Sequence, residues 1–64
     1  YSGSVTFGSS VTISVTGLTN DGTWGYNNSV ETAWEIQTTL NTGSITVTAL
    51  VSGTHDYKLL LFRI

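Results

Sequence analysis

Two stretches of this 64-residue chain alternate apolar and polar residues with a period of two. Val11, Ile13 and Val15 take every second position of the first stretch. The second stretch, residues 44–51, repeats the pattern with Ile45, Val47, Ala49 and Val51. Successive side chains of a β-strand point to opposite faces, so this period indicates strands that bury one face. The chain is therefore expected to be mainly β.

Three further strands are expected. The first is short and runs from Val5 to Phe7, and we expect it to form a hairpin with residues 11–16 through the turn at residues 8–10. The other two cover residues 23–26 and 57–64. Residues 20–22, Asn-Asp-Gly, separate the second strand from the third with typical turn chemistry.

Residues 32–42 are predicted to form the one α-helix, between the third and fourth strands. Thr32 and Glu35 have the spacing of a capping box, and Gly43 suits the position after a helix. At 100° per residue, three apolar side chains share one stripe: Ala33, Ile36 and Leu40. This order of elements is typical of a small five- to six-stranded OB-fold barrel, here a single domain over residues 1–64. A small β-sandwich with one stray helix is the alternative.

The predicted stripe leaves Trp34 outside the core, which makes its indole either a binding platform or a tryptophan packed between subunits. Trp24, by contrast, is expected to pack in the core or at a strand edge. His55 is interpreted as a loop residue without a particular role.

The last strand is apolar on both faces. Leu60, Phe62 and Ile64 are expected to face the core, which leaves the two intervening leucines for a neighbouring subunit. A domain this small, without Cys or a metal-ligand cluster, often gains stability by oligomerisation. The predicted subunit interface consists of Leu59, Leu61, Val11 and Ile13. The alternative is that the two leucines are half-exposed or covered by the N-terminal segment.

Charged residues are scarce. Lys58 and Arg63 stand against four acidic residues, for a formal net charge of −2. A nucleic-acid partner or an anionic membrane surface requires a basic patch, so neither is expected. No apolar run reaches the ~20 residues of a membrane span, so we expect no membrane insertion. No nucleophile motif, phosphate loop or metal-ligand spacing is present, so we expect no enzyme activity, cofactor or metal. The Thr, Ser and Asn content fits a secreted or extracellular protein.

The order of motifs in the second half of the chain carries a family resemblance. The predicted helix has a tryptophan near its start, followed by Ile, Gln, a hydroxyl residue and Leu: Trp34, Ile36, Gln37, Thr38 and Leu40. A Thr-Val-Thr strand follows at residues 46–48, then His55 and an aromatic residue, and the chain ends on Leu-Phe-Arg at residues 61–63. This series resembles the receptor-binding B subunits of Shiga-type toxins, although the disulfide that is usual in that family is absent because the chain has no Cys.

The resemblance implies an OB-fold subunit that binds cell-surface glycans multivalently as a homopentameric ring. It implies a carbohydrate site at Trp34, Glu35, Asp21, Thr23 and Tyr57, with the Trp34 indole stacked on a sugar. It also implies a polar ring centre at Gln37, Thr38 and Asn41, where a catalytic A subunit is a candidate partner. The alternative function is an extracellular structural β-protein, such as a filament or coat subunit, that self-assembles without binding sugar.

Overall fold

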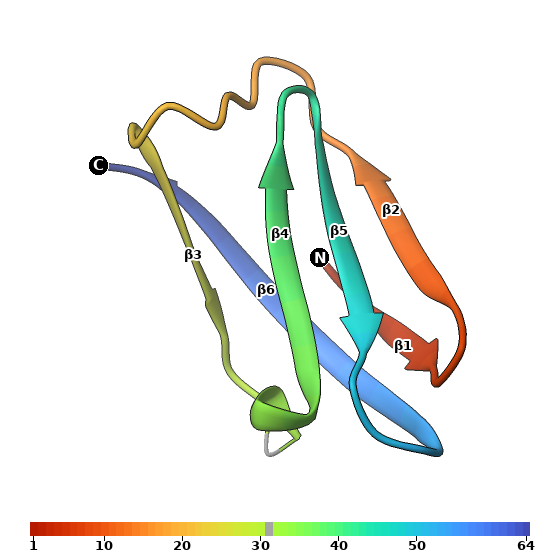
Figure 1. The fold of residues 1–64 in the computed structure, drawn as a ribbon. Helices are drawn as coiled ribbons and strands as arrows, with labels where there is room; N and C mark the ends of the chain where they lie inside the picture. The colour runs from red at the N-terminus through yellow and green to blue at the C-terminus, as the bar shows by residue number, and fades with distance from the viewer. Residues whose placement is uncertain (31) are drawn as a thin grey trace.

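Two three-stranded antiparallel sheets pack face to face in the computed structural model, which describes residues 1–30 and 32–64 (Figure 1). The first sheet has the strand order β1 (Ser2–Thr6), β6 (Thr54–Arg63), β3 (Trp24–Asn28). The second has the order β2 (Ser10–Ser14), β5 (Ser44–Ala49), β4 (Ile36–Asn41). The prediction of a mainly β chain is confirmed.

The period-two pattern predicts β5 and β2 correctly. In β5, every second side chain is buried, beginning with Ile45, and the residues between are partly exposed. In β2, Val11 and Ile13 are partly buried and pack against the core, while their neighbours are exposed. Alternation therefore places one face of the second sheet on the core and the other on solvent.

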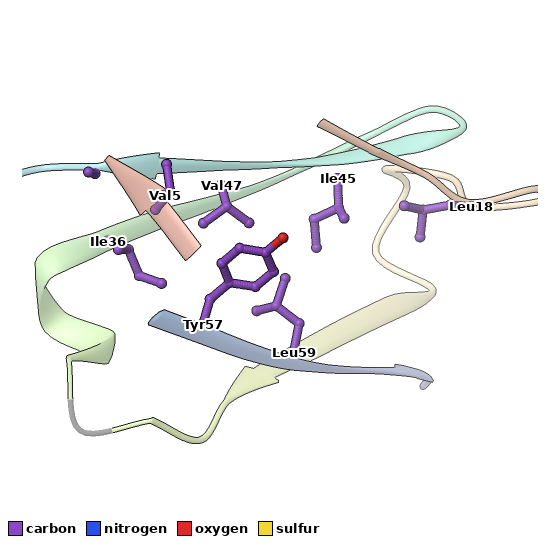
Figure 2. Close-up of a cluster of buried hydrophobic side chains, with 8 residues drawn as sticks. Val5, Leu18, Ile36, Ile45, Val47, Tyr57 and Leu59 are labelled. Atoms are coloured by element: carbon purple, nitrogen blue, oxygen red, sulfur yellow. The ribbon is translucent and has the colours of Figure 1, made fainter. Parts of the chain in front are cut away.

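Both sheets and the segment after β2 contribute to the core (Figure 2). The buried apolar residues are Val5, Leu18, Ile36, Ile45, Val47, Ala49, Tyr57 and Leu59. Leu18 lies between β2 and β3, and its burial closes one end of the space between the sheets. Trp24 is partly buried against this cluster, as predicted, and the Arg63 guanidinium carbon lies 5.0 Å from the centre of its ring.

The predicted α-helix at residues 32–42 is wrong. Ala33–Glu35 form a single 3-10 turn, η1, and Ile36–Asn41 form strand β4. Thr32 makes no side-chain cap, because its Oγ1 donates to the Asp56 carbonyl oxygen instead. The stripe through Ile36 and Leu40 fits a helix, yet the same two residues also fit a strand. Pairing along the whole of β5 provides backbone hydrogen bonds and burial together, and it decides the outcome.

The predicted barrel and first hairpin are also wrong. The described residues form no closed barrel but two separate sheets, which is closer to the sandwich alternative. β1 pairs with β6 and β2 pairs with β5, so the two strands expected to form a hairpin belong to different sheets. The short turn at Phe7 and Gly8 carries the chain from one layer to the other.

The last strand faces opposite to the prediction. Leu59 is buried and Leu61 packs against the core, whereas Leu60 is 64% exposed and Phe62 is 44% exposed. Ile64 follows the strand and is 82% exposed. The predicted subunit interface at Leu59, Leu61, Val11 and Ile13 therefore lies toward the protein's own core. A strand apolar on both faces does not reveal its register, because a shift of one residue exchanges its faces.

Two glycines in the strands beside β6 lie under aromatic rings of β6. A Cβ atom on Gly3 would lie 2.7 Å from the Tyr57 hydroxyl oxygen, and one on Gly25 would lie 2.6 Å from Phe62 Cε1. Each glycine is the direct partner of that aromatic residue across the sheet. The Tyr57 ring is buried inside the core, whereas the Phe62 ring lies on the outer face.

We expect the two glycines to respond differently to substitution by alanine. Gly3→Ala should lower the free energy of unfolding by about 1–3 kcal/mol, because the buried Tyr57 ring cannot move aside. Gly25→Ala should cost less than about 1 kcal/mol, since the exposed Phe62 ring can rotate and alanine suits a strand better than glycine. Urea denaturation of both variants measures the difference. Equal losses would contradict the proposed contrast between the two rings.

Candidate functional site

The most exposed tryptophan of the chain lies on the turn before β4. Trp34 is the middle residue of η1 and is 74% exposed. Leu50, across the β4–β5 pair, is a second exposed apolar side chain at this end of the molecule, 51% exposed. An indole that does not contribute to the core is available to a ligand.

Backbone hydrogen bonds fix this turn on both sides. The Ala33 N–H donates to the Val30 carbonyl at 3.2 Å, and the Glu35 N–H donates to the Thr32 carbonyl at 2.9 Å. The Leu50 N–H donates to the Glu35 carbonyl at 2.8 Å, which continues the β4–β5 ladder up to the turn. The backbone that presents Trp34 is thus tied to the second sheet.

Glu35 and His55 hold the turn to the first sheet. The Glu35 carboxylate Oε2 lies 3.3 Å from His55 Nδ1, and both side chains are largely shielded from solvent. His55 Nε2 lies 3.0 Å from the Val51 carbonyl oxygen and 3.1 Å from that of Ser52, so this nitrogen carries a hydrogen and donates it. The interpretation of His55 as a loop residue is wrong, because it is a buried residue of β6.

Sequence reasoning missed this Glu35–His55 pair. The available signal was the alternation of His55 with Tyr57 and Leu59, which places all three on the inner face of one strand. Glu35 was predicted as an acceptor for sugar hydroxyls. In the structure one of its oxygens faces His55, and this contact joins the turn that carries Trp34 to β6.

Asp21 and Thr23 lie far from this turn. They belong to the segment between β2 and β3, at the opposite end of the sandwich from η1 (Figure 1). Asp21 Oδ1 accepts hydrogen bonds from Thr19 Oγ1 at 2.9 Å and from the Thr23 N–H at 3.2 Å, as well as from the Thr23 hydroxyl. The structure therefore does not join these two residues to Trp34 in one site.

Tyr57 is not available to a ligand at all. Its side chain is buried between the sheets among the core residues (Figure 2). The prediction that it binds carbohydrate is therefore wrong. Whether an aromatic residue of an alternating strand is buried or exposed depends on which face of the strand is turned to the core. In β6 the buried face is the opposite of the expected one.

The predicted polar surface at Gln37, Thr38 and Asn41 does not exist as a single helix face. Gln37 and Asn41 lie on the outer face of β4, whereas Thr38 has the inward parity of the buried Ile36, and its carbonyl accepts the Tyr26 hydroxyl at 3.1 Å. The predicted ring centre therefore divides between two faces of a strand.

Neutral polar side chains cover the whole outer face of the second sheet. In register across the three strands, they form three rows, here called the neutral face: Ser10, Thr48 and Gln37; Thr12, Thr46 and Thr39; Ser14, Ser44 and Asn41. The Asn41 amide donates to the Thr46 hydroxyl at 3.1 Å. None of these nine residues is ionisable, so the face offers hydrogen bonds without charge.

A hollow of about 340 Å³ opens on the outer side of the other sheet. It is lined by Tyr1, Ser2, Ser29, Lys58, Leu59 and Leu60. None of the residues predicted to bind carbohydrate lines it. Trp34 is an exposed platform rather than the wall of a cavity.

Within residues 1–30 and 32–64, no group of three His, Cys, Asp or Glu side chains could hold a metal ion. In the same part of the chain, no helix has the length and hydropathy needed to cross a membrane. Comparisons of the chain with family models, curated proteins and solved structures gave no match.

The hydrogen bonds at Asp21 lead to a pH prediction. The Thr23 hydroxyl, and then the Thr19 hydroxyl, lower the pKa of the Asp21 carboxyl below its ordinary 3.8. A lowered pKa in the folded state adds stability above the unfolded-state pKa, and this stability is lost as the pH falls through the folded-state pKa. Thr23→Val should raise the pKa of Asp21 more than Thr19→Val does, because Thr23 contributes most.

A carbon-detected NMR titration of the Asp21 carboxyl between pH 2 and 6 would measure these pKa values. Ser4→Ala, which removes a hydroxyl that bonds Asp56 and not Asp21, serves as the control and should leave the pKa of Asp21 unchanged. A larger rise in Thr19→Val than in Thr23→Val would overturn the assignment.

Proposed function

We propose that this protein binds carbohydrate through the end of the sandwich that carries η1, with the Trp34 indole as the stacking platform. The observation that carries the proposal is a 74% exposed indole on a turn that is fixed to both sheets. Sugar rings present an apolar C–H face that stacks on an aromatic face, while their hydroxyls need polar neighbours.

The rigidity of the turn supports this role. A platform that is already ordered loses little conformational entropy when a ligand binds, so weak single contacts yield more affinity. The Glu35–His55 pair and the Leu50–Glu35 backbone bond provide that order without using the indole itself. The Trp34 indole can therefore contact a ligand, because it is not packed against the rest of the protein.

The chemistry near the turn favours a neutral glycan. Gln37 lies three residues after Trp34, and it begins the row of the neutral face nearest the turn, with Thr48 and Ser10. Hydroxyl and amide groups both donate and accept hydrogen bonds, as sugar hydroxyls do. The face has no positive charge to attract a phosphate or sulfate group.

Multivalence would strengthen such a site, because further sites on one assembly bind at high effective concentration after the first contact. The five-subunit ring and the A-subunit partner, which the resemblance to Shiga-type B subunits implies, stay predictions. The secreted location, which the Thr, Ser and Asn content suggests, also stays a prediction. The present proposal keeps the exposed tryptophan from that resemblance and does not require the helix or the barrel.

Replacing Trp34 tests the proposal directly. Trp34→Ala should weaken glycan binding by at least about tenfold, or about 1.4 kcal/mol, because the stacking surface is removed. Since the side chain is exposed, the midpoint of urea denaturation should stay unchanged. A glycan array identifies the ligand, and titration calorimetry of that glycan measures the affinity.

Two control variants make the result specific. Asp21→Asn alters the distant end of the molecule and should bind as the wild type does. Trp24→Phe leaves Trp34 as the one tryptophan, so its fluorescence should change as glycan is added. Undiminished binding by folded Trp34→Ala would remove the indole from the site, and the absence of any glycan ligand for the wild type would refute the function.

A further inference from the structure

His55 is a buried ionisable residue whose two ring nitrogens face different partners. Its side chain lies on the inner face of β6. Nε2 lies within hydrogen-bond distance of two backbone carbonyl oxygens, those of Val51 and Ser52. A carbonyl oxygen can only accept a hydrogen bond, so Nε2 carries a hydrogen whether the ring is neutral or charged. Nδ1 is therefore the nitrogen that gains or loses a proton in the folded chain.

The partner of Nδ1 is a carboxylate, so this contact requires the additional proton. Glu35 Oε2 lies 3.3 Å from Nδ1. In the neutral ring Nδ1 has a lone pair, and an ionised carboxylate can only accept, so no hydrogen lies between the two atoms. When the ring takes up a proton, the imidazolium Nδ1–H donates to the carboxylate. The contact between η1 and β6 is therefore attractive only while His55 holds that proton.

Other charged side chains of the described residues do not replace this pair. The strands β1, β4 and β5 and residues 50–53 contain no Asp, Glu, Lys or Arg. On β6 itself, Tyr57 shares the inner face with His55, and phenols ordinarily ionise only in alkaline solution. Asp56 lies on the outer face, where it accepts a hydrogen bond from the Ser4 hydroxyl. Glu35 is thus the charged group that His55 faces.

The Glu35–His55 contact lies directly beside the proposed glycan platform. Glu35 follows Trp34 and is the last residue of η1. Before the indole, the Thr32 hydroxyl joins the turn to the Asp56 carbonyl of β6 at 3.1 Å, and this bond involves no ionisable group. After the indole, the Glu35 carboxylate joins the turn to His55. The two contacts flank Trp34, so loss of the second releases one side of the turn from β6.

We propose that Glu35 and His55 position Trp34 through this proton, so that its loss loosens the turn and weakens glycan binding. The effect on binding rests on the proposed function, whereas the effect on the turn does not. Histidine side chains ordinarily lose their second proton between about pH 5 and pH 8, where glutamate is mostly ionised. Because only the protonated ring makes the contact, its contribution is present below this range and is lost as the pH rises through it.

The tautomer of His55 can be observed directly, because the chain has one histidine. Nitrogen-15 NMR of the ring should show a hydrogen on Nε2 at every pH. It should also show Nδ1 changing from N–H to a bare nitrogen as the pH rises. A neutral ring that keeps its hydrogen on Nδ1 would overturn the proposal, since the carboxylate would then retain its donor.

Two variants in a Trp24→Phe background, where Trp34 is the one tryptophan, test the effect on the turn. In the background protein, the fluorescence anisotropy of Trp34 should fall between about pH 6 and about pH 8.5. In Glu35→Gln it should stay level, because the amide accepts from Nδ1–H and donates to bare Nδ1. Asp56→Asn removes the neighbouring carboxylate of the outer face and should keep the full change. Level anisotropy in the background protein, or a change that persists in Glu35→Gln, would contradict the role of the pair.

Glycan affinity is the second readout. The wild type should bind its glycan at least about threefold more weakly at about pH 8.5 than at about pH 6, because a loosened platform must be ordered on binding. Glu35→Gln should bind equally at both pH values. Equal affinity of the wild type at both would overturn the proposal. If no glycan binds at either pH, the proposed function fails, and the anisotropy of Trp34 alone decides whether the pair positions the turn.

Discussion

The structure depends on the offset pairing of β6, which takes one partner along its first half and another along its second. Because it is twice the length of β1 or β3, one strand carries both as neighbours on opposite edges. Its inner side chains, among them His55, Tyr57 and Leu59, then join the core to the turn at Glu35.

The sequence was sufficient where only one period fits. In β5 the alternation of Ile45, Val47 and Ala49 admits a strand and little else, and the strand was predicted within two residues of its observed end. Residues 36–41 were ambiguous, because Ile36 and Leu40 are four apart and suit both a helix and a strand. Only the presence of β5 alongside resolves that ambiguity, and partners distant in sequence are invisible to a local pattern.

The residues of the candidate site were also predicted correctly only in part. Exposure of Trp34 was expected from a helix that does not exist, and it holds because the indole also lies outside the core of the observed turn. Tyr57 was misplaced, since a strand that is apolar on both sides gives no evidence of which side is buried. The Glu35–His55 contact joins residues twenty positions apart, and it needed the packing of the two sheets to be found.

The neutral face has a consequence for how the molecule meets its surroundings. With nine side chains that neither gain nor lose a proton, the hydration of this surface stays constant from acid to alkaline conditions and responds little to added electrolyte. Solubility on that side then comes from hydroxyl and amide contacts with water instead of from electrostatic repulsion between molecules. Such a surface suits a protein that must stay dispersed where acidity and salinity fluctuate.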